Sequence, residues 1–326
     1  MRLITYDDVF DIYYRLNLKG WGFLRSKLSF NKLIRTYSSF NSDESHTSNW
    51  WNIPAVRIRW NRIITGNPEK NYVDYVFEKY LKEKQNLKLL SPGCGVCSNE
   101  LKFAGFPSFG KITCIDLADK PLYTAKRIAK QEGLNQMEFL KGDVNEMDFP
   151  GNYYDVVLFN SSLHHFKNVE NLLLNRISKT LKDDGLLVIN EYVGPDRLQW
   201  SKSQLKIVNE LLQNSIPEKY KRRYKSRFSK SRLSGPGILR MIFSDPSEAV
   251  DSENIIPALR KGFITLEEKY PGGNILMPLL KDIAFHFTEE DPEAMVLLDE
   301  LMKAEDEFLN DNQSDNIFGI YRKKQS

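Results

Sequence analysis

From about residue 87 onward, the chain alternates between short apolar runs and longer stretches with helical spacing. The apolar runs predict five strands, at 87–91, 111–116, 137–141, 154–159 and 185–192. Apolar residues recur at helical spacing between them, at 97–105, 119–133 and 168–182. Such alternation is typical of a parallel sheet with helices on both faces. The pattern therefore predicts a doubly wound α/β fold.

The segments outside this alternation predict additions to one core. A helix is expected from Pro68 to the first strand, with proline in its first turn. Strands are expected at 263–268 and 317–321, and a helical segment at 275–309. The chain thus divides into a helical extension at 1–66, a core at 67–197, a helical lid insertion at 198–261 and a C-terminal completion of the sheet at 262–326. Within the extension, residues 39–48 have a turn-like composition.

The end of the first strand carries the most informative chemistry. It runs into Ser-Pro-Gly-Cys-Gly, and the next strand ends on Asp116, 21 residues after Gly95. Glycine at 93 and 95 lets backbone N–H groups approach a ligand without a Cβ in the way. A carboxylate at the neighbouring strand tip can hold both hydroxyls of a ribose. We expect a nucleotide pocket here.

The glycine turn alone leaves several interpretations open. Gly93-x-Gly95-x-x-Ser98 approximates a dinucleotide fingerprint, which would suit an NAD-dependent dehydrogenase. Cys94 and Cys97 form a C-x-x-C pair, which suggests a redox or metal site, although no second pair and no nearby histidine completes it. The turn could also serve only helix packing.

The downstream segments favour S-adenosylmethionine. Here the chain resembles the class I S-adenosylmethionine-dependent methyltransferases, because five of their motifs occur in order and at suitable spacings. The five segments are 91–100, 114–126, 141–144, 154–166 and 181–185. The resemblance implies a Rossmann-like, seven-stranded methyltransferase sheet, S-adenosylmethionine as cofactor and methyl transfer as the reaction.

The resemblance also assigns cofactor contacts. It implies that backbone amides of the glycine turn meet the methionine carboxylate, and that residues at the second strand's tip hold the ribose. It further implies that residues after the third strand meet the adenine, and that those after the fourth face the amino-acid end. The residues concerned are Gly93, Cys94 and Gly95; Asp116 and Leu117; Asp143 and Val144; and Asn160 and Ser161.

The chain departs from the family pattern at the methionine end. Ser91 stands where most members carry an acid, and Cys97 stands where they carry a third glycine. Glu100 could replace part of the missing acid or simply stabilise a helix N-terminus. A longer pattern resembles a bacterial methyltransferase subgroup associated with glycan and polysaccharide biosynthesis, through residues 50–54, 59–61, 65–66, 190–195 and 272–274.

A sulfonium methyl is already activated, so the protein must align the acceptor, exclude water and, for a hydroxyl, supply a base. Glu191 ends the fifth strand at the expected cofactor mouth. The histidine candidates are His164, His165 and His286, each weighed against a packing role. Tyr192 and Trp51 are candidates for acceptor contact, with Trp51 equally suited to anchoring the N-terminal segment.

Composition limits the partners. The 326 residues carry a net charge of only +3, which does not demand nucleic acid. Lys219 to Arg232 nevertheless holds eight basic residues and no acid, with Tyr220, Tyr224 and Phe228 at the spacing of one helix face. This segment is either a solvated helix or a lid for a phosphate-bearing acceptor, such as a nucleotide-linked or lipid-linked sugar.

Three cysteines suit a reducing cytoplasm, and no apolar run reaches the length of a membrane span. A homodimer is compatible with the sequence, which does not fix the oligomeric state. We therefore expect a methyltransferase acting on a sugar or other small biosynthetic hydroxyl. The alternatives are an RNA or protein methyltransferase, a nucleotide-binding module, or a dehydrogenase using the same turn.

Overall fold

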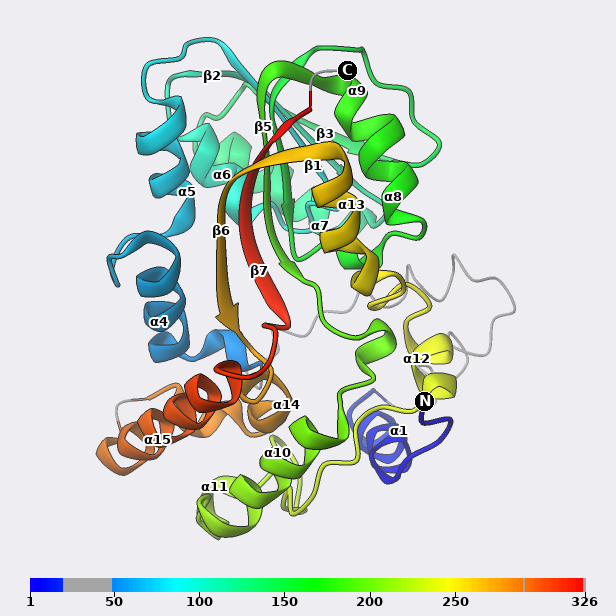
Figure 1. Cartoon of the computed structure of the whole chain (residues 1–326), viewed down its shortest axis with the longest axis vertical. Coiled ribbons are helices and arrows are strands. Elements are labelled where there is room, and N and C mark those ends of the chain that lie inside the picture. Colours follow the sequence, from blue (N-terminus) through cyan, green and yellow to red (C-terminus); the bar gives the residue numbers. More distant parts are fainter. Residues whose placement is uncertain (20–48, 290, 325–326) are drawn as a thin grey trace.

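The computed structural model of the protein describes residues 1–19, 49–289 and 291–324. Within these residues the chain builds a seven-stranded sheet in the order β3-β2-β1-β4-β5-β7-β6 (Figure 1). Strands β1 to β5 are parallel to one another, and β7 runs antiparallel between β5 and β6. The strands are β1 (Leu87–Pro92), β2 (Phe109–Asp116), β3 (Met137–Lys141), β4 (Tyr154–Asn160), β5 (Leu181–Tyr192), β6 (Phe263–Gly272) and β7 (Asn316–Lys323).

All five strands predicted for the core are present, and the predicted fold class is confirmed. The central strands β1 and β4 are buried on both faces, which explains their near-continuous apolar runs. β5 begins at Leu181, before the expected start at 185, because the chain re-enters the sheet through a register shift opposite Tyr154 and Val156.

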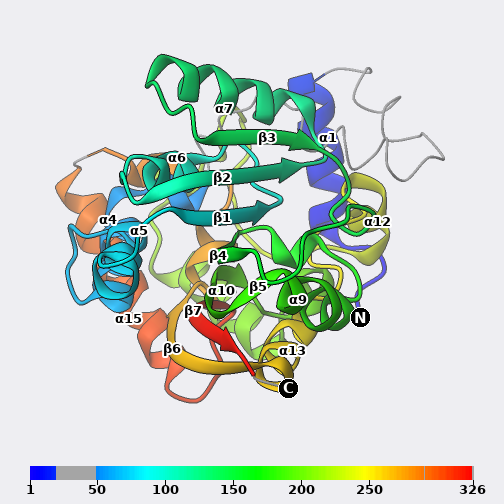
Figure 2. The ribbon, with the colours of Figure 1, turned by 90° about the horizontal axis from the view of Figure 1, so that it is seen from above.

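Helices cover both faces of the sheet. One apolar layer packs under α4, α5 and α6, and the other packs under α8 and α13. Figure 2 shows α4 and α5 on one side of the sheet and α9 and α13 on the other. The bounds are α4 (Pro54–Thr65), α5 (Tyr72–Val76), α6 (Ser98–Ala104), α7 (Asp119–Gln131), α8 (Val169–Asn171), α9 (Ser178–Thr180) and α13 (Ile255–Gly262).

A second group of helices lies beyond the carboxyl ends of the parallel strands, in the lower half of Figure 1. It joins segments that are distant in the chain: buried Asp8 accepts hydrogen bonds from the Gly237 amide (2.8 Å) and the Arg240 side chain (2.9 Å). This group is α1 (Tyr6–Lys19), α10 (Lys202–Asn214), α11 (Glu218–Lys221), α12 (Ile238–Ser244), α14 (Leu276–Leu280) and α15 (Pro292–Leu309).

The predicted basic helix through Tyr220, Tyr224 and Phe228 is wrong. α11 ends at Lys221, and the chain turns back so that Arg222 bridges to Ser229 in an antiparallel pair. Tertiary contacts override the helical spacing here. Arg223 pairs with Asp282 at 2.6 Å, and buried Lys230 donates to three backbone carbonyl groups at the end of α14 and just after it.

Two other predicted helices also differ from the structure. The helix before β1 starts at Tyr72 rather than at Pro68, because the Asn71 side chain accepts hydrogen bonds from the amides of Val73 and Asp74. The segment 275–309 is interrupted, since α14 and α15 are separated by a turn around Asp282, whose φ is positive.

The turn-like 39–48 lies outside the described residues. The division of the chain into an extension, core, lid insertion and completion stays a prediction. No described helix combines the length and apolar composition needed to cross a bilayer.

Candidate active site

The glycine turn after β1 has the backbone shape that the sequence indicated. Gly93 and Gly95 have φ angles of 71° and 55°, in the left-handed region that favours glycine. A Cβ on Gly93 would come within 2.8 Å of the Ser162 Cβ, so this position is closed by packing. A Cβ on Gly95 would meet nothing within 4 Å. The turn is therefore tight on its β4 side and open at Gly95, where a ligand can reach the backbone.

Asp116 joins this turn to the tip of β2. One carboxylate oxygen accepts the Gly95 amide at 2.8 Å, and the other accepts the Ala118 amide at 2.8 Å. Each oxygen keeps a further acceptor position, which suits the two hydroxyls of a ribose. Leu117, beside it, is half-buried. The donor and acceptor set thus fits an adenosyl ligand laid across Gly95.

The candidate adenine contacts sit at the neighbouring strand tip. Asp143 is half-buried and accepts hydrogen bonds from the backbone and side chain of Asn145, at 2.8 and 3.0 Å. Val144 is buried, and the Gly142 amide donates to the Asp116 carbonyl at 3.1 Å. The tips of β2 and β3 are therefore tied together at one edge of the site.

The candidate methionine end lies after β4. Asn160 Oδ1 accepts hydrogen bonds from the Tyr72 hydroxyl at 3.0 Å and from Asn190 at 2.9 Å. Ser161 is exposed with a positive φ of 51°. Tyr72 lies within the helix that the sequence predicted from Pro68 onward, and sequence reasoning assigned its side chain no role. Its hydroxyl has no signal of its own in the sequence, and only the packing of α5 against β4 brings it to Asn160.

Glu100 occupies the region where the family acid is missing. Its buried carboxylate accepts a hydrogen bond from the Ser91 hydroxyl at 2.6 Å. Burial and, to a smaller extent, the nearby Cys97 raise the pKa of Glu100 to about 7. The structure thus links the serine that replaces the strand acid to a carboxyl group on α6.

Glu191 is the most connected side chain at the acceptor end. It is 1% exposed, and one carboxylate oxygen accepts the amides of Ser162 and Leu163, at 2.6 and 2.8 Å. The other oxygen lies 2.8 Å from Nδ1 of His164. These contacts arise because β4 and β5 are neighbours and the short helix Leu163–His165 follows β4 directly.

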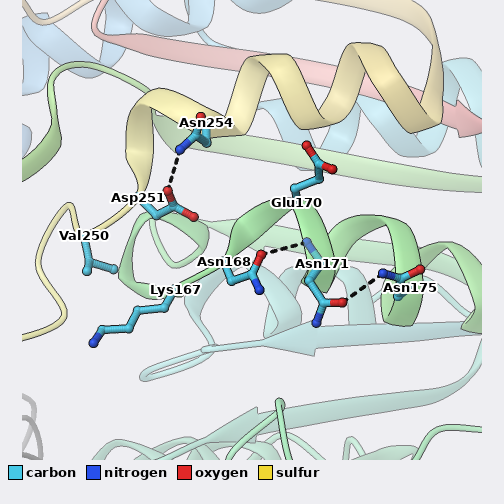
Figure 3. A pocket seen from close by; sticks show the side chains of 8 residues that line it. All are labelled: Lys167, Asn168, Glu170, Asn171, Asn175, Val250, Asp251 and Asn254. Atoms are coloured by element: carbon cyan, nitrogen blue, oxygen red, sulfur yellow. Dashed lines mark hydrogen bonds between the residues drawn. The ribbon is translucent and has the colours of Figure 1, made fainter.

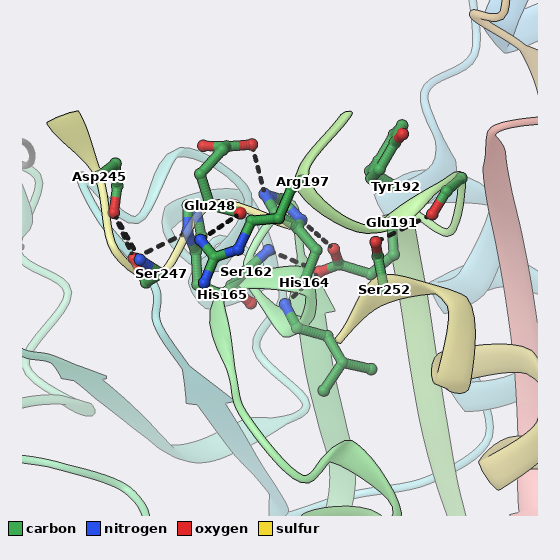
Figure 4. Close-up of polar contacts among 12 residues, drawn as sticks. Ser162, His164, His165, Glu191, Tyr192, Arg197, Asp245, Ser247, Glu248 and Ser252 are labelled. Atoms are coloured by element: carbon green, nitrogen blue, oxygen red, sulfur yellow. Dashed lines mark hydrogen bonds and ion pairs between the residues drawn. The ribbon is translucent and has the colours of Figure 1, made fainter. Parts of the chain in front are cut away.

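His164 lies between two carboxylates, as Figure 4 shows. Nδ1 faces Glu191, and Nε2 lies 3.8 Å from Glu248. Burial of the ring lowers its pKa, but the hydrogen bond that the ring donates to Glu191 and the nearby acids outweigh burial, so the pKa of His164 is raised. Because a carboxylate only accepts, Nδ1 carries the proton and Nε2 is left to act as a base.

His165 is placed against the insertion. Its Nδ1 lies 3.2 Å from the Ser247 hydroxyl, and burial together with His164 lowers its pKa. Ligand atoms of His164, His165 and Glu248 all lie within 4.8 Å of one another, close enough to hold a cation. Sequence reasoning missed Ser247 and Glu248, which reach the site only because the insertion folds back over it.

The other predicted acceptor residues have different surroundings. Tyr192 is buried beside His164, with ring centroids 6.2 Å apart, and its hydroxyl donates to the Pro195 carbonyl at 3.1 Å. Trp51 stacks edge to face on Trp60 with centroids 4.5 Å apart. The structure places Trp51 in an aromatic cluster at the start of α4.

No hydrogen bond or ring contact in the described part of the structure joins His286 to Glu191 or His164. Its Nε2 lies 2.9 Å from the Arg222 carbonyl oxygen, and its ring lies 3.9 Å from that of Phe285. His286 therefore belongs to the helical group that contains α11 and α14.

A cavity of about 660 Å³ opens elsewhere, between α8 and the start of α13 (Figure 3). Its lining is polar and includes Lys167, Asn168 and Asp251. The Asn168 and Asp251 side chains are already occupied, capping Asn171 and accepting the Val169 amide. None of the predicted site residues lines it. We therefore place the candidate active site at the glycine turn and Glu191, on the donor and acceptor chemistry found there.

Comparison with known proteins points the same way. Residues 90–189 match the family described as a methyltransferase domain. Over 152 residues the chain is 28% identical to the ubiquinone biosynthesis O-methyltransferase of Rickettsia felis, covering 45% of this chain and 57% of that protein. Over 114 residues it is 32% identical to a sterol 24-C-methyltransferase of Gibberella zeae, covering 35% of this chain and 29% of that protein.

Among solved structures, the fold resembles phosphoethanolamine N-methyltransferase 2 of Haemonchus contortus in complex with phosphomonomethylethanolamine and S-adenosylhomocysteine. The TM-score is 0.51 at 17% identity, covering 89% of this chain and 60% of that one. The chain spans little more than half of the first relative and less than a third of the second. By their names these proteins methylate oxygen, carbon and nitrogen, so the likeness does not identify the acceptor atom. The match over residues 90–189, together with the seven-stranded sheet, supports a methyltransferase domain of the class I, S-adenosylmethionine-dependent type.

Proposed function

We propose that the whole chain is an S-adenosylmethionine-dependent O-methyltransferase whose acceptor is a small biosynthetic hydroxyl compound, with a sugar as the first candidate. The observation that supports it is the buried pair of His164 and Glu191, with Nδ1 and the carboxylate 2.8 Å apart. Hydroxyl acceptors need a base, whereas amine acceptors can react as the free amine. A histidine oriented by a carboxylate is a base of this kind.

The pair is connected to the cofactor turn through Ser162. The Ser162 amide donates to Glu191 at 2.6 Å, and its hydroxyl donates to the Pro92 carbonyl at 2.9 Å, immediately before Gly93. A movement of the base would therefore disturb the turn. This coupling supports a mechanism in which donor and acceptor are held in one rigid frame.

S-adenosylmethionine would supply an activated methyl group. In our proposal Asp116 holds the ribose, Gly95 gives access to the backbone, and Asp143 with Val144 orients the adenine. His164 Nε2 accepts the proton of the acceptor hydroxyl as the oxygen attacks. Glu191 keeps the Nδ1 proton in place and stabilises the imidazolium that results. Tyr192, buried beside the ring, helps to exclude water.

A sugar acceptor is supported by the resemblance to methyltransferases of glycan biosynthesis. The basic segment lends less support than its charge suggests, because Arg223 pairs with Asp282, Lys221 with Glu218 and Lys219 with Glu293. Arg222, Arg227 and Arg232 are exposed, and contact between them and an acceptor phosphate stays a prediction. A cytoplasmic site of action is supported by three cysteines without a disulfide.

The test combines binding and turnover. Calorimetric titration should show S-adenosylhomocysteine binding in preference to NAD. An acceptor panel of free sugars, nucleotide-linked sugars, phenols and amines should then yield S-adenosylhomocysteine with a hydroxyl substrate. Preference for NAD would contradict the methyltransferase proposal, and methylation restricted to amines would contradict the hydroxyl acceptor.

Two variants address the base. His164→Gln and Glu191→Gln should each lower kcat by about 10²–10⁴-fold, the usual contribution of a general base, while the Kd for S-adenosylhomocysteine changes little. His165→Gln is the matched control and should retain most activity. Turnover that is lost to a chelator and restored by a divalent cation would instead assign His164, His165 and Glu248 to a metal.

A further inference from the structure

The three cysteines of the chain converge directly beneath the glycine turn. Cys94 lies within the turn, Cys97 immediately precedes α6, and Cys114 lies in β2. Their sulfur atoms are all within 4.8 Å of one another, and none is in a disulfide. The sequence pairs Cys94 with Cys97, but Cys114 joins them only because the β1–β2 register sets it beside Ser91.

The three cysteines differ in solvent exposure and in backbone conformation. Cys94 is half-buried, whereas Cys97 and Cys114 are buried. Cys97 has a φ of 57°, a left-handed conformation that costs a residue with a Cβ about 1–2 kcal/mol. Most class I methyltransferases carry glycine at this position. The chain thus holds a thiol in the one place of the turn where glycine would fit with less strain.

The charges around the three sulfur atoms distinguish between a metal site and a disulfide. Hydrogen bonds from Cys114 and Cys94 lower the pKa of Cys97 to about 5, which favours the thiolate form of this sulfur. The carboxyl groups of Asp116 and Glu100 are close enough to oppose further negative charge on Cys97 and Cys114. A metal site would need three thiolates there, and no fourth histidine, cysteine or carboxylate donor joins the group among the described residues. A neutral disulfide adds no charge.

We propose that Cys94 and Cys97 are an oxidative modification site, which peroxide converts to a disulfide that weakens cofactor binding. The modification itself depends only on the sulfur cluster. Its effect on the cofactor rests on the proposed function, because it requires the glycine turn to hold S-adenosylmethionine.

The step is balanced by hydrogen peroxide as oxidant. The sulfur of half-buried Cys94 attacks one peroxide oxygen while its proton passes to the Cys97 thiolate. The O–O bond breaks, and the leaving hydroxide takes a proton from solvent to become water. The Cys97 sulfur then displaces the hydroxyl group of the Cys94 sulfenic acid, and the S–S bond forms with release of a second water. One thiol and one thiolate lose two electrons and one proton, and one peroxide, with one proton from solvent, becomes two waters.

The backbone already brings this pair together. The Cys97 amide donates to the Cys94 carbonyl at 3.0 Å, which closes a four-residue turn. The Cα atoms of such a turn lie within about 7 Å, at the edge of the roughly 4.4–6.8 Å that disulfides span. An S–S bond is about 2 Å long, so the turn must contract around Gly95. Gly95 donates its amide to Asp116, and the contraction would disturb the groups proposed to meet ribose and methionine.

The experiment treats the reduced full chain with stoichiometric hydrogen peroxide. Peptide mapping by mass spectrometry should find the Cys94–Cys97 linkage, and calorimetry should find S-adenosylhomocysteine bound about tenfold more weakly. Dithiothreitol should restore the original affinity. A linkage to Cys114, a linkage between two chains, no linkage, or unchanged affinity of the linked protein would each overturn the proposal.

Two variants complete the test. Cys97→Gly places the family residue in the left-handed position, so the variant should fold and bind S-adenosylhomocysteine like the reduced wild type, yet not respond to peroxide. Cys114→Ala should still form the linkage. An undiminished peroxide response of Cys97→Gly contradicts the assignment. If the reduced wild type binds no S-adenosylhomocysteine, the proposed function fails, while peptide mapping still decides whether the modification site exists.

Discussion

The two halves of the candidate site are built in different ways. The cofactor half uses the tips of β1, β2 and β3, and its contacts lie within one loop or join two neighbouring strand tips: Asp116 bonds to Gly95 and Ala118, and Asp143 to Asn145. The acceptor half gathers groups from β4, β5 and the insertion. There Glu191 orders the amides after β4 and orients His164. Glu248 approaches the ring from the opposite side.

The cofactor half follows from the general topology of a parallel sheet, whereas the acceptor half depends on contacts specific to this chain. Strand tips in a parallel sheet always meet at one edge, so a ligand site there follows from the topology. The acceptor half also depends on how the segment that carries Glu248 returns to the sheet. The names of the relatives specify oxygen, carbon and nitrogen acceptors, so the likeness to them leaves the acceptor half unassigned. Substitutions in the two halves should therefore affect different measured quantities.

Among substitutions of Asp116, Glu100 and Glu248, we expect the substitution of Asp116 in the cofactor half to have the largest effect. Asp116→Ala removes both proposed ribose contacts and leaves the Gly95 and Ala118 amides without their acceptor. We expect S-adenosylhomocysteine to bind more weakly by about 1–3 kcal/mol, measured by calorimetry. Asp119→Ala, which removes only an exposed ion pair with Lys141, is the control. Equal affinities of the two variants would place the ribose elsewhere.

The buried acid beneath the turn should affect stability rather than binding. Burial raises the pKa of Glu100 to about 7, so between about pH 4.5 and 7 the folded state holds a proton that the unfolded state has lost. Stability from this group is therefore lost as pH rises through that window. Glu100→Gln should be unchanged at pH 5 and more stable than wild type by about 1–2 kcal/mol at pH 8.

Urea unfolding at the two pH values measures this difference, with the exposed Glu83→Gln as control. Burial also raises the pKa of Asp315 to about 7, so the variant keeps part of the same pH dependence. If the free energy of unfolding changes with pH in the same way for the wild type and Glu100→Gln, the pKa of Glu100 is not raised by folding.

The smallest effect should come from the insertion side of the acceptor half. Glu248 is one of the acids that raise the pKa of His164, and its carboxylate is partly exposed. Glu248→Gln should therefore shift the acidic limb of the kcat profile to lower pH, because His164 then loses its proton more readily. Turnover should change by less than about fivefold at any pH, as expected for a weak ion pair. A shift to higher pH would exclude His164 as the group that titrates.

The sequence anticipated the backbone shape at the tips of β1 and β2 closely because its signals there are local. A buried strand followed by glycines, and a second strand ending in an acid, specify both the backbone shape and the ligand groups. Tyr72 and Glu248 could not be found in this way, since a tyrosine in a helix and an acid in a polar insertion have many other uses. The prediction of a basic helix at 219–232 was wrong for a related reason. The spacing suited a helix, but buried Lys230 and the Arg223–Asp282 pair impose an irregular path.

The sequence by itself determined the α/β alternation, the strand positions and the glycine turn, because hydrophobic period and glycine conformation act over a few residues. Tertiary structure alone decided that Glu191 orients His164, that the insertion returns over them, and that Cys114 joins Cys94 and Cys97. These contacts connect residues distant in the chain. Their existence depends on strand order and packing, which no local pattern encodes.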